Sequence, residues 1–171
     1  MPSPTAGKVR LLFLDVDGTL TDGVIGWDTR GDQRNFFVRD GIALEWARDL
    51  GLLPVVISGR DSAAVKGRMV DLKLEHYLGI KDKVAVAQEV RAREQVLWGD
   101  CAAVGDDLPD VPLLKRVGWP IAVADAVQQV KDVARTTTLL DAGRGAAREV
   151  VELILKHNGT WDQVLRKYEA I

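Results

Sequence analysis

The sequence predicts an α/β protein built on a doubly wound, Rossmann-like parallel sheet. Short apolar runs that are typical of buried strands, such as residues 11–14 and 52–57, alternate along the chain with segments of helical spacing. Polar loops containing Gly or Asp follow several of these runs, as expected at the functional edge of an open sheet. The 171 residues are enough for one domain with a substantial core, and 47% hydrophobic and 28% charged residues are typical of a globular protein.

The elements follow from local spacing and from stop signals. Gly51 is expected to end a helix over residues 42–50 that opens after Arg39-Asp40-Gly41, and Asn158-Gly159 separates the last two helices. The expected strands are residues 11–14, 52–57, 101–104, 121–123 and 136–140, and residues 77–80 are expected to be a short strand or a loop. The expected helices are residues 42–50, 62–72, 83–94, a short one at 113–116, one between the last two strands, 146–157 and 162–168.

Residues 23–38 predict a β-hairpin flap, because two β-prone runs flank a polar turn that contains Gly31. Trp27, Phe36 and Phe37 give this hairpin more aromatic surface than an isolated exposed hairpin should have, so we expect it to pack against something. We expect residues 1–8 to be a disordered arm and residues 9–171 to form a single domain that ends in a helical tail over residues 143–171.

Composition excludes several classes of protein. The net charge of −2 provides no basic patch for nucleic acid. No apolar stretch approaches the roughly 18 residues of a membrane span, and the first residues lack the apolar segment of a signal peptide. The single cysteine, Cys101, cannot form an internal disulfide. We therefore expect a cytoplasmic protein with no nucleic-acid or membrane partner.

The most informative stretch is Leu14-Asp15-Val16-Asp17-Gly18-Thr19, directly after the first buried strand. Residues two apart point the same way from a strand, so the carboxylates of Asp15 and Asp17 can converge. Two carboxylates held together repel unless a cation joins them or one keeps a proton. Both arrangements suit phosphoryl transfer.

Three further loops are expected at the same edge of the sheet. Asp106, Asp107 and Asp110 follow the strand at residues 101–104, and oxygen ligands of this kind suit Mg²⁺. Ser58-Gly59 follows a strand where we expect a helix to start, so its hydroxyl and amide groups can hold phosphate oxygens. Lys83 stands at another expected helix start, where a cation is unfavourable unless an anion lies nearby.

Taken in order, these four motifs resemble those of the haloacid dehalogenase-like phosphatases over roughly residues 9–150. The resemblance implies that Asp15 is the nucleophile, that Asp17 is the general acid and base, and that Ser58 and Lys83 bind the transferring phosphoryl group. It also implies one Mg²⁺, held by Asp15, the backbone carbonyl of Asp17 and Asp106. The roles of Asp107 and Asp110 stay open; one of them could hold Lys83 or a metal-bound water.

Neither interval between the motifs has room for a cap domain, so the chain falls in the capless group. There it resembles the phosphatases of 3-deoxy-D-manno-octulosonate 8-phosphate, in residues 20–23, 38–42, 58–60 and 143–149. The resemblance implies hydrolysis of a sugar-acid phosphate in lipopolysaccharide biosynthesis by a homotetramer. The substrate-binding residues then expected are Asp17, Ser58, Gly59, Arg60, Arg68, Lys83 and Arg144. Ser58 and Ala142 depart from residues common in that family without removing a functional group.

Two other interpretations remain open. A related phosphatase for a nine-carbon sugar acid 9-phosphate would look similar, but such relatives tend to carry Glu at the position of Arg60. A non-enzymatic phospho-receiver module also combines acids with Ser or Thr and Lys on an α/β fold. In a receiver, however, the acid pair comes first and the phosphoacceptor stands alone on a later strand, which is not the order of Asp15 and Asp17 here.

Overall fold

The computed structural model describes residues 7–29 and 31–171. Most of the arm expected at residues 1–8, and Arg30 in the turn of the expected hairpin, lie outside the described residues. Within the described part of the chain, no helix is long and apolar enough to cross a membrane.

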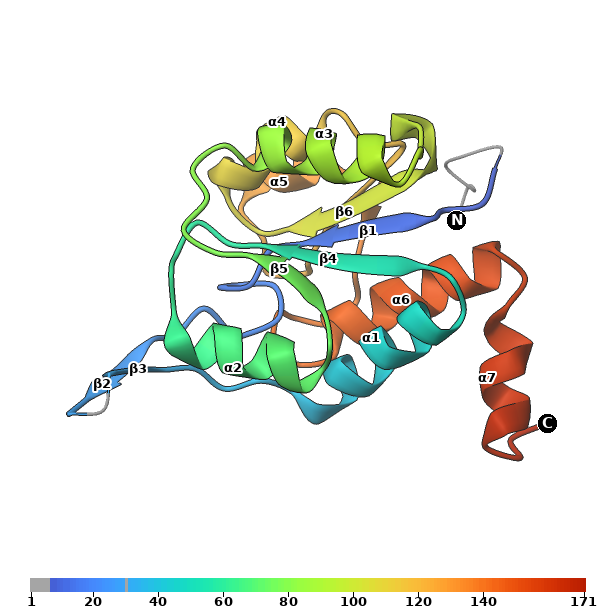
Figure 1. The fold of residues 1–171 in the computed structure, drawn as a ribbon, viewed down its shortest axis with the longest axis horizontal. Coiled ribbons are helices and arrows are strands. Elements are labelled where there is room, and N and C mark those ends of the chain that lie inside the picture. Colours follow the sequence, from blue (N-terminus) through green and yellow to red (C-terminus); the bar gives the residue numbers. More distant parts are fainter. Residues whose placement is uncertain (1–6, 30) are drawn as a thin grey trace.

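One parallel sheet organises the molecule, with the strand order β5-β4-β1-β6-β7-β8 (Figure 1). Every neighbouring pair in it is parallel, which confirms the predicted doubly wound architecture. The strands are β1 (Leu11–Leu14), β4 (Leu53–Ile57), β5 (Glu75–Tyr77), β6 (Cys101–Gly105), β7 (Trp119–Ala122) and β8 (Thr136–Thr137).

Helices cover both faces of this sheet. In Figure 1, α3, α4 and α5 lie on one face, and α1, α2 and α6 lie on the other, with α7 beyond α6. The α-helices are α1 (Val38–Asp49), α2 (Ala63–Asp71), α3 (Lys83–Arg93), α4 (Val111–Leu114), α5 (Gln128–Val133), α6 (Ala146–His157) and α7 (Trp161–Lys167). Two short 3₁₀ helices are η1 (Trp98–Asp100) and η2 (Leu108–Asp110).

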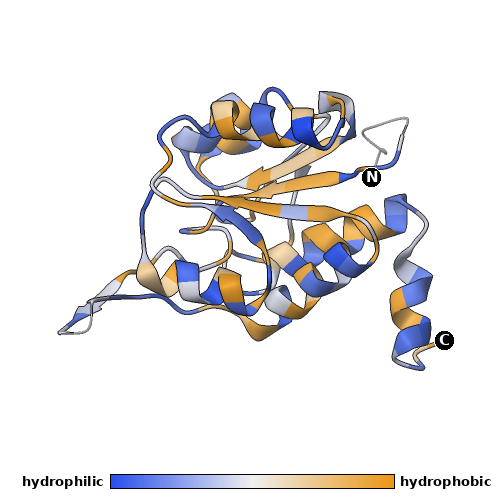
Figure 2. Ribbon diagram, in the orientation of Figure 1, coloured by the Kyte–Doolittle hydropathy of each residue, from blue (hydrophilic) through white to orange (hydrophobic). Residues whose placement is uncertain are grey.

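Strand β1 lies at the centre because every residue in it is apolar and buried. It pairs with β4 on one side and β6 on the other, and these three strands appear as hydrophobic ribbons between more polar helices in Figure 2. The chain fills one side of β1 with β4 and β5 before it returns to the other side with β6. This reversal places a crevice beyond the carboxyl end of β1, where open α/β sheets bind ligands.

The predicted hairpin is present as β2 (Gly26–Asp28) paired antiparallel with β3 (Gly31–Gln33). It projects from the body of the molecule (Figure 1). Phe36 packs against the hydrophobic core, as the aromatic content predicted, whereas Trp27 is 76% exposed. Within the described residues, no further domain is inserted between the sheet elements.

Two local predictions were wrong about where a helix begins. Helix α1 begins at Val38, so Arg39, Asp40 and Gly41 form its first turn instead of preceding it. Helix α2 begins at Ala63, and Ser62 caps it by accepting a hydrogen bond from the Val65 amide; Ser58 and Gly59 therefore belong to a loop, not to a helix start. For α1, a contact from a distant segment holds the first turn, and for α2, the better capping residue Ser62 decides where the helix begins.

Asp40 is buried in the first turn of α1, where its carboxylate accepts a hydrogen bond from a second helix, α6. Its Oδ1 accepts a hydrogen bond of 2.8 Å from the Arg148 amide in the first turn of α6, which is the helix that packs on α1. Burial raises the pKa of Asp40 to about 6, although the backbone amides of Arg148 and Gly145 and the charge of Arg148 oppose the shift. The folded state therefore holds a proton on Asp40 more tightly than the unfolded chain does.

This shift predicts a pH-dependent contribution to stability. Between about pH 4 and pH 6 the folded state binds more protons at Asp40, so its contribution is most favourable at low pH and is lost as pH rises through about 6. Asp40→Asn keeps an acceptor but cannot ionise. We expect the unfolding free energy of the native chain, relative to that variant, to fall by about 1–3 kcal/mol between pH 4.5 and 7.5 in urea titrations. A difference that is constant with pH would show that Asp40 does not titrate in this range.

Candidate active site

The carboxyl ends of β1, β4 and β6 open onto one cavity of about 360 Å³. Seven of the residues predicted from sequence line it: Asp15, Asp17, Ser58, Gly59, Arg60, Lys83 and Asp106. These residues come from three separate strand ends and the start of α3, so the topology of the sheet brings them together.

The loop after β1 is fixed by its own backbone. The Val16 carbonyl accepts hydrogen bonds from the amides of Thr19, Leu20 and Thr21, at 2.9–3.1 Å. Gly18 has a φ of +91°, and a Cβ at this position would stand 2.1 Å from Oδ2 of Asp106. Glycine is therefore required both for the turn and for the close approach of the Asp106 carboxylate.

Lys83 is the central cation of the cavity. Its Nζ lies 2.5 Å from Oδ1 of Asp15 and 2.7 Å from Oδ1 of Asp110, and its side chain is 7% exposed. Burial alone would lower the pKa of Lys83, but the two carboxylates outweigh it and raise that pKa. The start of α3 is unfavourable for a cation. The placement of Lys83 there is explained by the two carboxylates that accept hydrogen bonds from its ammonium group.

Acidic side chains outnumber basic side chains in the lining of the cavity. Burial and the charge of Asp110 raise the pKa of Asp15 to about 6 in spite of Lys83. Burial, with the charges of Asp15, Asp110 and Asp107, raises the pKa of Asp106 to about 8. Asp106 has only a weak partner among the described residues, the hydroxyl of Thr19 at 3.4 Å. A further cation beside Asp15 and Asp106 would relieve this repulsion.

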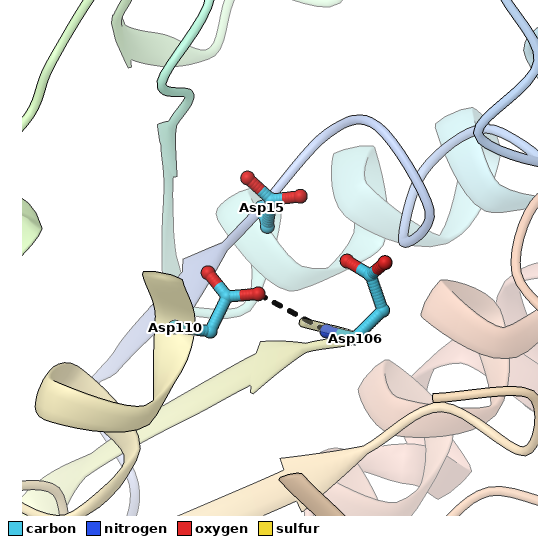
Figure 3. A group of neighbouring side chains, drawn as sticks. All are labelled: Asp15, Asp106 and Asp110. Atoms are coloured by element: carbon cyan, nitrogen blue, oxygen red, sulfur yellow. Dashed lines mark hydrogen bonds between the residues drawn. The ribbon is translucent and has the colours of Figure 1, made fainter. Parts of the chain in front are cut away.

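The carboxylate oxygens of Asp15, Asp106 and Asp110 form a group that could hold a metal ion. One oxygen from each lies within 4.8 Å of the others, and Figure 3 shows the three side chains gathered in one place beyond the strand ends. Asp110 is already occupied, because it accepts hydrogen bonds from Lys83 and from the amides of Asp106 and Asp107. Asp15 and Asp106 are consequently the side chains of this group that remain available to a metal, and Asp110 holds Lys83 in place.

The segment after β4 is a well-anchored loop. The Ser58 amide donates to the Tyr77 carbonyl, the Ser58 carbonyl accepts from Ile80, and Ser58 Oγ accepts from the Arg60 amide, at 2.9–3.2 Å. Arg60 extends over the cavity with 65% of its side chain exposed, and its Nε lies 3.6 Å from Oδ2 of Asp17. Arg60 is therefore free to exchange this contact for an anionic group of a ligand.

Two predicted binding residues lie elsewhere. Arg68 pairs with Asp71 at 2.7 Å and packs against Gly41, so nothing in one chain supports its contact with substrate. Arg144 lines a second cavity of about 390 Å³, together with Phe37, Leu139 and Arg148. Within a single chain neither arginine joins the residues that line the main cavity.

Sequence reasoning missed Arg34. This residue follows β3, yet its guanidinium is buried against Asp17, with Nε 2.5 Å from Oδ1 and Nη2 3.2 Å from Oδ2. An arginine in a short polar hairpin is ordinarily exposed. No local pattern could have revealed that the hairpin folds Arg34 back onto a loop 17 residues earlier.

Comparison with known proteins defines the class. A family model for haloacid dehalogenase-like hydrolases matches residues 79–150. The 3-deoxy-D-manno-octulosonate 8-phosphate phosphatase KdsC of Escherichia coli K12 is 36% identical over 160 residues, 92% of this chain and 85% of that protein. The sheet and the acid-rich cavity are accordingly those of a haloacid dehalogenase-like hydrolase, and the receiver interpretation is wrong.

Two solved structures that resemble this chain come from one family within the hydrolase class. The Moraxella catarrhalis 3-deoxy-D-manno-octulosonate 8-phosphate phosphatase, in complex with magnesium, phosphate and KDO, is 33% identical with a TM-score of 0.90, covering 94% of this chain and 93% of that one. The cobalt-bound Haemophilus influenzae enzyme is 33% identical with a TM-score of 0.86, covering 90% and 91%. This chain belongs to the 3-deoxy-D-manno-octulosonate 8-phosphate phosphatase family, as its motifs predicted.

Proposed function

We propose that this protein hydrolyses 3-deoxy-D-manno-octulosonate 8-phosphate to 3-deoxy-D-manno-octulosonate and phosphate, in lipopolysaccharide biosynthesis in the cytoplasm. The observation that supports this most directly is the close arrangement of Asp15, Lys83 and Asp106 at the carboxyl end of β1, in a chain of this family. We also propose that residues 9–171 act as a single catalytic domain.

Asp15 is the proposed nucleophile. One of its carboxylate oxygens forms a bond to phosphorus while the bond from phosphorus to the sugar oxygen breaks. The electron pair of the broken bond stays on the sugar oxygen, which takes a proton from Asp17, two residues along the same loop. The products of this half-reaction are the free sugar acid and an aspartyl phosphate at Asp15.

Asp17 then reverses its role. It accepts a proton from a water molecule while the water oxygen bonds to phosphorus, and the bond to the Asp15 oxygen breaks to release phosphate. Asp17 suits both steps because its side chain reaches the cavity and remains 17% exposed. Ser58 and Lys83 bind the phosphoryl oxygens in both half-reactions.

Mg²⁺ is the proposed cofactor. Asp15, Asp106 and the backbone carbonyl of Asp17 would hold it, and its charge would offset the negative charge of the transferring phosphoryl group. Burial and the charges of neighbouring acids raise the pKa of Asp106, which supports this assignment, because a second cation there would satisfy acids that Lys83 alone cannot.

Specificity is assigned to the rim of the cavity. Gly59 leaves the backbone accessible, and Arg60 can pair with the carboxylate of the sugar acid. A panel of sugar phosphates assayed with Mg²⁺ tests the proposal: the eight-carbon acid phosphate should give the highest kcat/KM. Preference for the nine-carbon acid 9-phosphate would contradict the assigned substrate, and no turnover of any sugar phosphate would contradict the function.

Arg60→Gln is expected to raise KM for 3-deoxy-D-manno-octulosonate 8-phosphate by about 10- to 100-fold, because a charge-assisted pair contributes about 1.5–3 kcal/mol. Its effect on p-nitrophenyl phosphate, which has no carboxylate, should be within about threefold. Arg60→Glu should be worse than Arg60→Gln on the sugar acid. Equal losses on both substrates would mean that Arg60 does not recognise the carboxylate.

We further propose a homotetramer. The cavity has no cap to enclose it, while Val24 and Trp27 expose apolar surface on the projecting hairpin that a second copy could cover. Arg144 would then meet substrate in a neighbouring subunit. Sedimentation at assay concentration tests this: a fully active monomer would contradict it. Mixing an Asp15→Asn chain with a chain that lacks the hairpin tip but keeps Arg34 should restore activity only if the hairpin of one subunit completes the site of another.

A further inference from the structure

Arg34 connects the base of the hairpin to the loop after β1. Its side chain is only 2% exposed, and its guanidinium contacts both oxygens of the Asp17 carboxylate. Paired contacts of this kind fix the plane of a carboxylate as well as its position. Each oxygen has a second lone pair, so contact with Arg34 leaves the Asp17 carboxylate able to contact a bound molecule as well.

Arg34 is itself held from the other side. Its Nη1 donates to Ser62 Oγ at 2.9 Å and pairs with Asp32, while Ser62 Oγ donates to Asp32 at 2.6 Å. Ser62 also caps α2. The guanidinium is therefore fixed between a hairpin residue and a helix terminus, and its orientation toward Asp17 does not depend on a bound ligand.

The contrast with Arg60 separates the two arginines beside Asp17. Arg60 is 65% exposed and touches Asp17 through one long contact of 3.6 Å, which suits a group that exchanges partners. Arg34 is buried, has several partners and does not line the cavity. Its position suits a group that acts on Asp17 and not on the substrate.

We propose that Arg34 is a positioning residue for Asp17. It holds the Asp17 carboxylate facing the cavity, so that this group can protonate the departing sugar oxygen and later accept a proton from water. The hairpin thereby contributes to catalysis within its own subunit, in addition to any contact between subunits. This inference rests on the proposed phosphatase function, because it assigns a purpose to Asp17 in that reaction.

The test uses Arg34→Met and two substrates whose leaving groups differ. Departure of a sugar alkoxide needs a proton from Asp17, whereas departure of p-nitrophenolate hardly does. With 3-deoxy-D-manno-octulosonate 8-phosphate, kcat should fall about 10²-fold with KM changed by less than about threefold. With p-nitrophenyl phosphate, we expect a rapid burst of about one nitrophenolate per active site, followed by slow turnover as the poorly activated water attacks.

Arg34→Lys should recover part of the loss, since it keeps the charge but not the paired geometry. Arg93→Met is the matched control: Arg93 also pairs with both oxygens of a carboxylate, that of Glu75, but does not line the cavity, so its kinetics should equal those of the wild type. Arg34→Met removes the ion-pair partner of Asp32. If the variant does not fold for this reason, the Arg34→Met/Asp32→Asn chain and Arg34→Lys provide the same comparison.

Equal losses on both substrates without a burst, a change in KM alone, or no loss would each overturn the role assigned to Arg34. Failure of the proposed phosphatase function and failure of the role assigned to Arg34 give different results. A wild-type chain inactive toward every phosphate ester would refute the proposed function, whereas an active wild type whose Arg34→Met variant gives no nitrophenolate burst would refute only this inference.

Discussion

Replacing Asp15 with asparagine should reduce turnover of 3-deoxy-D-manno-octulosonate 8-phosphate by at least about 10⁴-fold, a loss typical of removing a catalytic nucleophile. The amide is nearly the same shape as the carboxylate but is a far weaker nucleophile. The fold should persist, because the β1 backbone is held by its neighbours and the Asp15 amide by the Val104 carbonyl.

The control for this variant is Asp61→Asn, an exposed acid just beyond Arg60 that does not line the cavity. It should retain wild-type kinetics. Thermal unfolding and circular dichroism should be similar for all three chains. A folded Asp15→Asn chain that retained more than about a tenth of the wild-type rate would contradict the role of Asp15.

Removal of Mg²⁺ should have the second largest effect. With a chelator in excess, we expect turnover to fall by at least about 10³-fold and to return on addition of Mg²⁺, because a metal at this position offsets charge that develops during phosphoryl transfer. Without it, Lys83 alone faces the negative charge of the phosphoryl group and of Asp15, so the transition state loses a large part of its charge stabilisation.

A binding measurement tests the Mg²⁺ site independently of turnover. By calorimetry, Asp106→Asn should weaken Mg²⁺ binding by about tenfold or more, whereas Asp132→Asn, an exposed acid on α5, should leave it unchanged. Full activity in the presence of chelator, or unchanged Mg²⁺ affinity in Asp106→Asn, would contradict the assignment of Asp106 as a ligand.

The parts of the site that could be predicted from sequence are those set by local pattern. The apolar run before Asp15 defines a buried strand, and the acids, Ser58 and Asp106 are placed by the strand ends that precede them. The parallel order of the sheet then brings them to one edge. No knowledge of side-chain packing is needed for this step.

The parts that could not be predicted depend on contacts between distant segments. Sequence left open whether Asp107 or Asp110 holds Lys83, because Lys83 and Asp110 are 27 residues apart. Arg34 reaches Asp17 only because the hairpin folds back. The start of α1 was misplaced since Asp40, which looked like a residue before a helix, lies within it and caps α6. Arg68 was expected to bind substrate from the family resemblance, but its guanidinium packs against Gly41 and pairs with Asp71.

The central claim is that the phosphoryl group passes through Asp15. Wild-type enzyme and the Asp17→Asn variant, turning over substrate with Mg²⁺, would be quenched in acid and reduced with borohydride, which converts an aspartyl phosphate to homoserine. Peptide mass spectrometry should then find homoserine at residue 15, only with substrate present and never in Asp15→Asn. Homoserine at another acid, or none in either chain during active turnover, would contradict the account.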